Sequence, residues 1–376
     1  MKINRRELTK FLRPADPFLA SVTLILVVIG LLMIYSSSAF LAAERYGDAT
    51  YFIKKEILFV VIGAGLALGV QRVPPQFWRD HVYWILGISA LLLLLVWVPG
   101  IGASAGGARR WIRLGGLRFQ PSELTKLALI IFMAYSLAKK GEKIRKFAVG
   151  MIPHSVVPGI FLAAILLQKD LGSVVTIGLV IVVLLFVAGL RLSHLAAVVI
   201  LFAPAFIAMI AAAQYRRERI AAFLDPWSHR LDSGFQIIQS LVSFKSGGLS
   251  GQGLGGGQQK LFFLPEAHTD FILAVIAEEL GWIGVASVLS LFAVFLTRAF
   301  MIAFKSPDPF GFYLGLGISL MLAVQILFNA GVVMAILPTK GMPLPFISYG
   351  GSNLAVSFIG VGMLMALSKN QWGVVH

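Results

Sequence analysis

The chain has 376 residues, of which 58% are hydrophobic and 13% charged, whereas a soluble domain has about 45–50% and about 25%. This balance excludes a soluble globular protein. The 32 Lys and Arg against 17 Asp and Glu give a net charge of +15. These cations stand between apolar runs, so anionic lipids and an anionic lipid-linked substrate are expected as partners, and nucleic acid is not. With no cysteine, disulfides, thiolate metal sites and Cys nucleophiles are excluded.

Ten apolar segments follow one another, each long enough to cross a bilayer as a helix of roughly 20 residues. They begin near residues 17, 54, 82, 121, 147, 171, 192, 271, 309 and 352. The first runs to about residue 35 after a basic stretch and exceeds the about 7–15 apolar residues of a signal peptide, so it is expected to be retained. We predict an all-α polytopic membrane protein, a single domain over residues 1–376.

The positive-inside rule orients these spans. An even number places both termini on one side, and Lys and Arg gather on that side at the amino terminus, at residues 139–146 and at Lys369. That side is predicted to be cytoplasmic. The opposite side then carries a long extracytoplasmic loop between helices 7 and 8, at about 215–270.

Two segments on the outer side carry cations against this rule. The first holds Arg109, Arg110, Arg113 and Arg118, and the second holds Arg216, Arg217, Arg219, Arg230, Lys245 and Lys260. A long folded connector can cross whatever its charge, which would explain the second segment better than the first. The functional explanation is an extracytoplasmic anion site.

The connector ends in the glycine-rich stretch 246–257, followed by Lys260. Consecutive glycines let backbone N–H groups approach an oxyanion, as in phosphate-binding nests. No Gly-Lys-Ser/Thr follows, so the stretch is not a P-loop. Phosphate contact and a merely flexible loop both remain open.

Two aspartates stand where spans begin on the outer side. Asp270 lies beside His268 at the mouth of the eighth span, where a carboxylate could accept a proton from a sugar hydroxyl. Asp170 stands at the start of the sixth span. The plain alternative for both residues is that they cap their helices. The rim thus gathers Arg109, Arg110, Asp170, His268 and Asp270 around one potential cavity.

Four ionisable residues lie within predicted spans: Glu123, Lys126, Glu278 and Glu279. A charge at such a depth costs about 2.5–3.5 kcal/mol on insertion scales, so it should face the bundle interior and be paired. From their similar depths we expect an ion pair between Lys126 and Glu278 or Glu279. This group is either architectural or part of a polar substrate cavity.

Six motifs in order resemble the SEDS family (shape, elongation, division and sporulation). They are Gly107–Ile112 with Phe119–Lys126, Phe223–Trp227, Gly234–Ser240, the glycine-rich loop, Leu264–Phe271 with Ala277–Gly281, and Pro345–Ser352. Leu337-Pro338-Thr339-Lys340-Gly341 is similar to the division-type branch. Met342–Phe346 is closer to the elongation-type branch, and Gln168-Lys169-Asp170 departs from the usual Gln-Pro-Asp.

The resemblance implies a peptidoglycan glycosyltransferase of the bacterial cytoplasmic membrane. Such an enzyme polymerises lipid II. It inverts the configuration at the anomeric carbon of the donor sugar and releases undecaprenyl pyrophosphate. Asp270 matches the family's general base and Arg110 its more important arginine, while Arg109 and Lys260 are further candidates for the pyrophosphate. Implied partners are a class B penicillin-binding protein transpeptidase and other division-complex membrane proteins.

Several readings stay open beside septal wall synthesis in cell division. A divalent cation, Mg²⁺ or Mn²⁺, is one alternative for stabilising the pyrophosphate, although no acidic cluster resembles a ligand set. A lipid II flippase, an elongation-type role in cell shape, a sporulation role and a non-catalytic scaffold are the rival functions. The expected substrate-binding residues are Arg109, Arg110, Lys126, Glu123, Asp170, Lys260, His268, Glu278 and Glu279.

Overall fold

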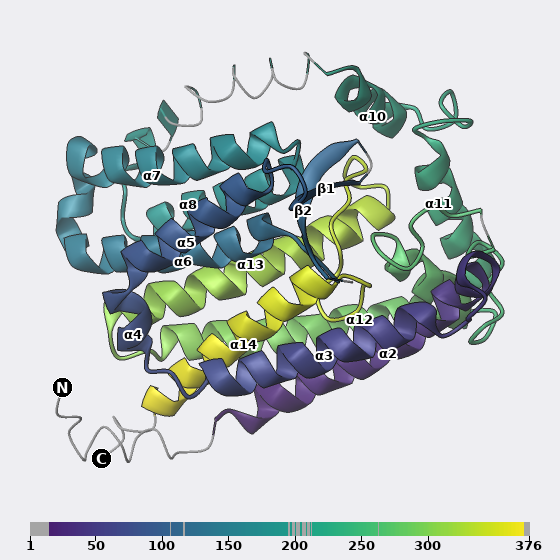
Figure 1. Cartoon of the computed structure of the whole chain (residues 1–376), viewed down its shortest axis with the longest axis horizontal. Coiled ribbons are helices and arrows are strands. Elements are labelled where there is room, and N and C mark those ends of the chain that lie inside the picture. Colours follow the sequence, from purple (N-terminus) through teal and green to yellow (C-terminus); the bar gives the residue numbers. More distant parts are fainter. Residues whose placement is uncertain are drawn as a thin grey trace.

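The computed structural model describes residues 15–371 apart from 106, 116, 195, 198–199, 201–203, 205–207, 209–210, 212 and 262. This part of the chain is a helical bundle with one small sheet (Figure 1). Its elements are α2 (Pro17–Tyr46), α3 (Tyr51–Val70), α4 (Pro75–Asp80), α5 (Val82–Leu95), β1 (Gly102–Ala105), β2 (Ala108–Leu114), β3 (Leu117–Phe119), α6 (Pro121–Lys140), η1 (Gly141–Arg145), α7 (Phe147–Leu167), α8 (Leu171–Val187), α10 (Gln214–Leu224), α11 (Phe235–Gly247), α12 (Ile272–Phe304), α13 (Pro309–Val333) and α14 (Gly351–Gln371).

Six of the described helices are long and apolar enough to cross a membrane: α2, α6 with η1, α7, α12, α13 and α14. The helices α5 and α8 are shorter and also apolar. The predicted seventh span, from about residue 192, lies largely outside the described residues. The helices confirm the prediction of an all-α polytopic membrane protein.

The first and last described spans meet at one end of the bundle (Figure 1). The Asp16 carboxylate lies 2.6 Å from Arg298 Nη2 on α12, and the Asp16 N–H donates to Ser368 Oγ on α14 at 3.3 Å. Asp16 also caps α2 by accepting the Leu19 N–H. The two spans therefore open on the same side, as predicted.

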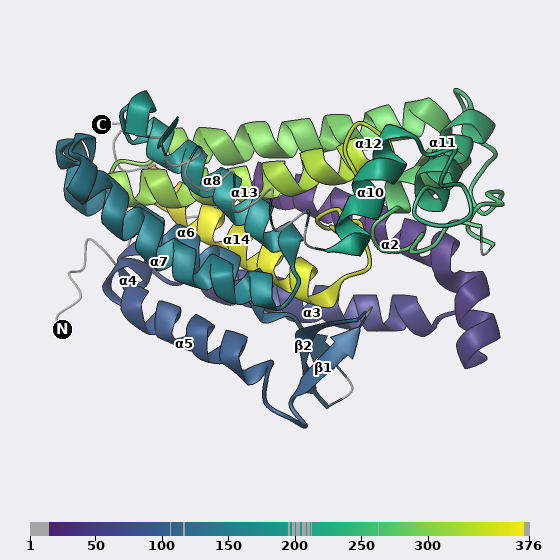
Figure 2. The same ribbon diagram turned by 90° about the horizontal axis from the view of Figure 1, so that it is seen from above.

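The arginine-bearing segment forms a three-stranded antiparallel sheet at the opposite end, beyond α5 (Figure 2). In the register of β1 and β2, Ala103 faces Trp111 and Ser104 faces Arg109, which leaves Arg110 as an extra residue in β2. A bulge of this kind twists the strand and re-aims a side chain. Arg110 is thus set apart from its neighbours by the backbone itself.

The long helix α12 is broken at Gly281, whose φ of 67° and ψ of −168° are not helical. The glycine-rich loop fills the break. Its Gly248 and Leu249 carbonyls accept the N–H groups of Trp282 and Ile283, while the carbonyls of Glu278 and Glu279 accept loop N–H groups. A Cβ on Gly281 would lie 2.4 Å from the Leu249 carbonyl oxygen, so no other residue fits here. The backbone groups freed by the break are satisfied by protein, as a membrane protein requires.

The break divides α12 into a short first piece and a long second piece. The part of α12 after Gly281 is roughly 35 Å long at 1.5 Å per residue, enough alone to cross a hydrocarbon core of about 30 Å. The exposed Trp282 stands at the break, and Trp is enriched at membrane interfaces. Residues 272–279 are almost fully buried within the protein, and Glu278 and Glu279 lie directly before the break.

Candidate active site

Asp270 lies at the outer end of α12 but does not cap it. The N-cap position is Phe271, and no side chain caps the helix there. The Asp270 carboxylate instead rests on Gly341, where a Cβ would lie 2.6 Å from Asp270 Oδ2. Burial raises the pKa of Asp270 to about 7, with help from Glu266 and against the charges of Arg219 and Arg110. The capping explanation fails, and the carboxyl group has the pKa of a general base that works near neutrality.

Asn329 on α13 fixes the backbone around this carboxylate. Its Nδ2 donates to the Asp270 carbonyl at 2.8 Å and to the Met342 carbonyl at 2.8 Å. Asn329 is 2% exposed, so this pair of bonds is shielded from water. One amide thereby ties the segment before α12 to the segment that carries Lys340 and Gly341.

Asp170 is the better-bonded of the two aspartates. It caps α8 by accepting the Ser173 N–H at 3.1 Å, and it accepts side-chain hydrogen bonds from Gln120, Ser122 and Ser173 at 2.7–2.9 Å. Burial acts to raise its pKa, but these hydrogen bonds and the charge of Arg110 together lower it. Asp170 is therefore an ionised, saturated carboxylate, which suits holding a cation better than accepting a proton.

Three cations surround the two aspartates. Arg110 acts electrostatically on both Asp170 and Asp270, and its buried Nε has no hydrogen-bond partner among the described residues. Arg219 on α10 donates to the Thr339 carbonyl at 3.4 Å, and Lys340 Nζ donates to the Leu171 carbonyl at 2.9 Å. Burial lowers the pKa of Lys340 to about 8, although Asp170 acts to raise it. Arg110 and Arg219 thus place positive charge near the Asp270 carboxyl group, and Lys340 lies near Asp170.

Arg109 was expected to share this role with Arg110. Its Nε lies against Gly102 on β1, where an added Cβ would come within 3.1 Å of it. Arg109 is thus packed along the neighbouring strand, while the bulge gives Arg110 its separate direction. The structure distinguishes two adjacent arginines that the sequence could not.

The glycine-rich loop binds carboxylates of the protein itself. Glu279 accepts the Gly255 N–H at 3.1 Å, Ser36 Oγ at 2.7 Å and Lys260 Nζ at 2.6 Å. Glu278 accepts the N–H groups of Gln258 and Gln259 at 2.9 and 3.2 Å. The loop does bind anions, as one of the two interpretations expected, but these anions are carboxylates of the protein itself. Lys260 forms an ion pair with Glu279. We call Ser36, Gly255, Lys260 and Glu279 the loop clamp.

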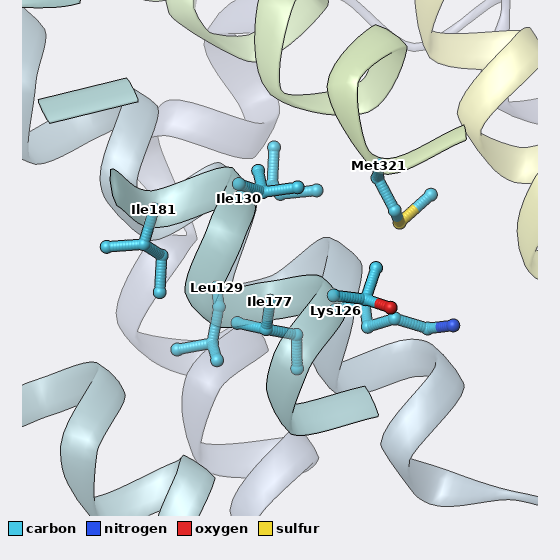
Figure 3. A pocket seen from close by; sticks show the side chains of 8 residues that line it. Lys126, Leu129, Ile130, Ile177, Ile181 and Met321 are labelled. Carbon is cyan, nitrogen blue, oxygen red and sulfur yellow. The ribbon is translucent and has the colours of Figure 1, made fainter. Parts of the chain in front are cut away.

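The expected ion pair between α6 and α12 is wrong. Lys126 pairs with Glu123 on its own helix at 2.8 Å, and Asn353 on α14 donates to Glu123 at 3.0 Å. The reason is the helical spacing of three residues, which brings the two side chains together within one turn. Figure 3 shows the Lys126 ammonium turned away from Leu129 and Ile181, which line a cavity of about 10 Å³ beside it. That volume reaches only the lower limit for one water molecule, so this cavity is too small for a substrate.

His268, expected among the substrate-binding residues, belongs to an aromatic cluster. Its ring lies 4.6 Å from that of Phe52 and 5.6 Å from that of Tyr349, and its carbonyl accepts the Tyr349 N–H. Burial lowers the pKa of His268, so the ring is neutral near pH 7. His268 joins α3, the segment before α12 and the segment before α14.

Sequence reasoning overlooked Lys340, Arg219 and Asn329. The signal for Arg219 was its place on the outer side against the charge rule, which it shared with several other residues. The signal for Lys340 was the motif Leu337–Gly341, which was used only to compare branches of the family. Asn329 lies in an apolar stretch, where nothing distinguishes it from a buried polar residue of the bundle. For a divalent cation, the described residues hold no cluster of three His, Asp or Glu, and the two aspartates already face cations.

These features define a polytopic membrane protein in which the buried carboxylates Asp170 and Asp270 and the cations Arg110, Arg219 and Lys340 gather at one end of the bundle. Residues 17–372 match the FtsW, RodA and SpoVE family of cell cycle proteins, and the chain belongs to this family. The resemblance drawn from the six motifs is thereby confirmed. The chain is a multi-pass protein of the bacterial cytoplasmic membrane.

Three similar proteins extend over nearly the whole chain. A probable peptidoglycan glycosyltransferase FtsW of Geobacter metallireducens is 44% identical over 99% of this chain and 98% of its own. The stage V sporulation protein E of Bacillus subtilis is 41% identical over 94% and 96%. Among solved structures, a chain from a peptidoglycan synthase complex that coordinates polymerization and crosslinking matches with a TM-score of 0.77 at 29% identity, covering 96% of this chain and 99% of that one.

Proposed function

We propose that the chain is a peptidoglycan glycosyltransferase that polymerises lipid II on the outer face of the cytoplasmic membrane. One observation carries the proposal: the Asp270 carboxyl group, with a pKa of about 7, lies on Gly341 under the influence of Arg110 and Arg219. A general base and a cationic site for a leaving group are the two requirements of glycosyl transfer from a pyrophosphate.

In the proposed reaction Asp270 removes the proton from the 4-hydroxyl of the acceptor sugar. The hydroxyl oxygen attacks the anomeric carbon of the donor sugar, and a new glycosidic bond forms as the bond from that carbon to the pyrophosphate oxygen breaks. Undecaprenyl pyrophosphate leaves from the opposite face, so the configuration inverts. Arg110 and Lys340 would stabilise the negative charge that develops on the leaving group.

The division role rests on relatives. Proteins named FtsW at 43–44% identity cover this chain almost completely, which supports septal wall synthesis over an elongation-type role. The stage V sporulation protein E is nearly as similar, and it makes sporulation the second candidate. The synthase-complex neighbour supports assembly with a class B penicillin-binding protein transpeptidase that crosslinks the new strands.

A lipid II flippase would need free polar side chains through the whole bilayer depth. In the described part of the chain, Lys126 is neutralised by Glu123 and Lys260 by Glu279. The unpartnered cationic atom, Arg110 Nε, lies at the outer end. This distribution favours chemistry at the outer face over transport.

The test is polymerisation of lipid II by the purified protein together with its transpeptidase partner. General-base catalysis contributes about 10²–10⁴-fold, so Asp270→Asn should nearly abolish glycan polymer while folding and partner binding persist. Asp232→Asn, at an exposed connector residue, is the matched control and should retain activity. Polymer formation by the Asp270→Asn protein at the wild-type rate would refute the proposal.

A further inference from the structure

An apolar groove of about 320 Å³ lies between α2, α3 and α14. Such a volume is at the lower end of the range for ligand pockets. Its lining side chains are apolar apart from Thr23, whose hydroxyl donates a hydrogen bond to the Leu19 carbonyl. Six of them are Ala20, Val27, Ala64, Ala67, Phe358 and Val361. Small side chains on α2 and α3 thus leave unfilled space beside the larger residues of α14.

The groove belongs to the cytoplasmic half of the bundle. Its lining residues lie close to the start of α2 and toward the ends of α3 and α14, which meet at the end where Asp16 joins Arg298. Leu24 and Leu68 on its rim are 64% and 53% exposed. The groove therefore opens toward the hydrocarbon of the cytoplasmic leaflet.

Two cations stand at the cytoplasmic mouth of the groove. Lys369 follows the lining residue Met365 by one helical turn, and Arg72 follows the lining residue Leu68 by four residues. The two cations are close enough to repel each other. Lys369 is only 8% exposed, and neither cation forms an ion pair within the described residues. A buried lysine beside a second cation calls for an anion.

We propose that the groove and its cation pair bind one diacyl phospholipid with an anionic headgroup from the cytoplasmic leaflet. An acyl chain would fill the apolar space, and the headgroup phosphate would lie between Arg72 and Lys369, because basic pockets between membrane helices on this side bind anionic headgroups. The candidate active site is at the other end of the bundle, so this lipid is distinct from the sugar-bearing substrate. It would hold α14 against α2 and α3.

Native mass spectrometry of the full chain tests the proposal. The protein is released from nanodiscs that contain equal amounts of phosphatidylglycerol and phosphatidylcholine with the same acyl chains. We expect one retained lipid, with phosphatidylglycerol strongly preferred. Neutralising each cation should weaken retention by roughly fivefold, so Arg72→Gln with Lys369→Gln should remove the preference. Ala64→Phe should block the acyl chain and lower retention of both lipids.

Two control variants separate a site from a generally basic surface. Lys305→Gln removes an exposed cation near the cytoplasmic end of α12, and Val61→Phe enlarges an exposed residue of α3 outside the groove. Both should retain phosphatidylglycerol as the wild type does. Equal retention of the two lipids, or equal loss in the Lys305→Gln protein, would overturn the proposal.

Two further outcomes would assign the groove to another occupant and overturn the proposal as well. Undecaprenyl phosphate added to the nanodiscs should leave the retained phosphatidylglycerol in place; its displacement would indicate a polyprenyl lipid. If Ala64→Phe releases the transpeptidase partner without changing lipid retention, the groove receives a protein helix. Size-exclusion chromatography shows whether each variant is folded, and the double glutamine variant keeps the test valid if Ala64→Phe is not.

Discussion

Burial raises the pKa of Asp270 to about 7 and lowers the pKa of Lys340 to about 8. A general base must be deprotonated, so the polymerisation rate should rise with pH through about 7. A cation that stabilises the leaving group must stay protonated, so the rate should fall above about 8. The pH profile of the initial rate is expected to be a narrow bell, measured with lipid II as substrate.

Arginine keeps its charge across this whole range. In the Lys340→Arg protein the alkaline limb should therefore move to higher pH, while the acidic limb stays near 7. The control is Lys245→Arg, at an exposed residue at the end of α11, which should keep both limbs. An alkaline limb that does not move would exclude Lys340 as the group that titrates there.

The sequence predicted the role of some site residues better than that of others. Asp270 was identified from its position at a helix mouth and from the family motif, and the structure removed the capping alternative. The role of Lys340 depends on a contact with the Leu171 carbonyl, 169 residues away, and that of Asp170 on Gln120 and Ser122, 50 and 48 residues away. Charge and spacing along one chain do not encode such contacts.

At the scale of elements, the loop clamp should stabilise the broken top of α12. Glu279 is fully buried and the Lys260 side chain is 8% exposed, and removing one partner of a buried pair costs about 3–5 kcal/mol because the other charge is stranded. Glu279→Gln should thus lower the thermal unfolding temperature in detergent. A second change, Lys260→Met, should restore part of the loss.

The ion pair of Lys54 with Asp48 provides a matched control, since both side chains are largely exposed. Asp48→Asn should leave the thermal unfolding temperature nearly unchanged, because exposed ion pairs contribute little to stability. A double variant as unstable as Glu279→Gln alone would show that the stranded charge of Lys260 is not the cause of the loss.

The break at Gly281 could not be predicted from the sequence. Hydropathy continues through residues 272–304, so the segment reads as one span, and only the positive φ of Gly281 and its bonds to the loop reveal two pieces. The glycines after residue 246 were recognised as an anion cradle. Which anion they hold depends on the path of the connector, and composition does not determine that path.

For the whole molecule, apolar segments and charge asymmetry were sufficient for the architecture. They predicted helical spans in which the first begins and the last ends on the same side of the membrane. At that end Asp16 forms an ion pair with Arg298 and donates a hydrogen bond from its N–H to Ser368. The sheet at the outer end was missed as structure, because its strands are short and rich in arginine. Its arginines were noticed only because the positive-inside rule disfavours Lys and Arg in short loops on the outer side of the membrane.

The two ends of the molecule should respond separately to mutation. Arg298→Met strands the Asp16 carboxylate, which is 4% exposed, while the Arg298 side chain is 32% exposed, so the loss of stability should be about 1–3 kcal/mol, less than for a fully buried pair. Arg298 is 28 residues from Asp270, and the unbroken part of α12 from Gly281 to Arg298 alone is roughly 25 Å long at 1.5 Å per residue. The variant should therefore unfold at a lower temperature yet keep both limbs of the pH profile when assayed well below that temperature. A shifted acidic limb in the Arg298→Met protein would instead show that the ion pair of Asp16 with Arg298 is coupled to the environment of Asp270.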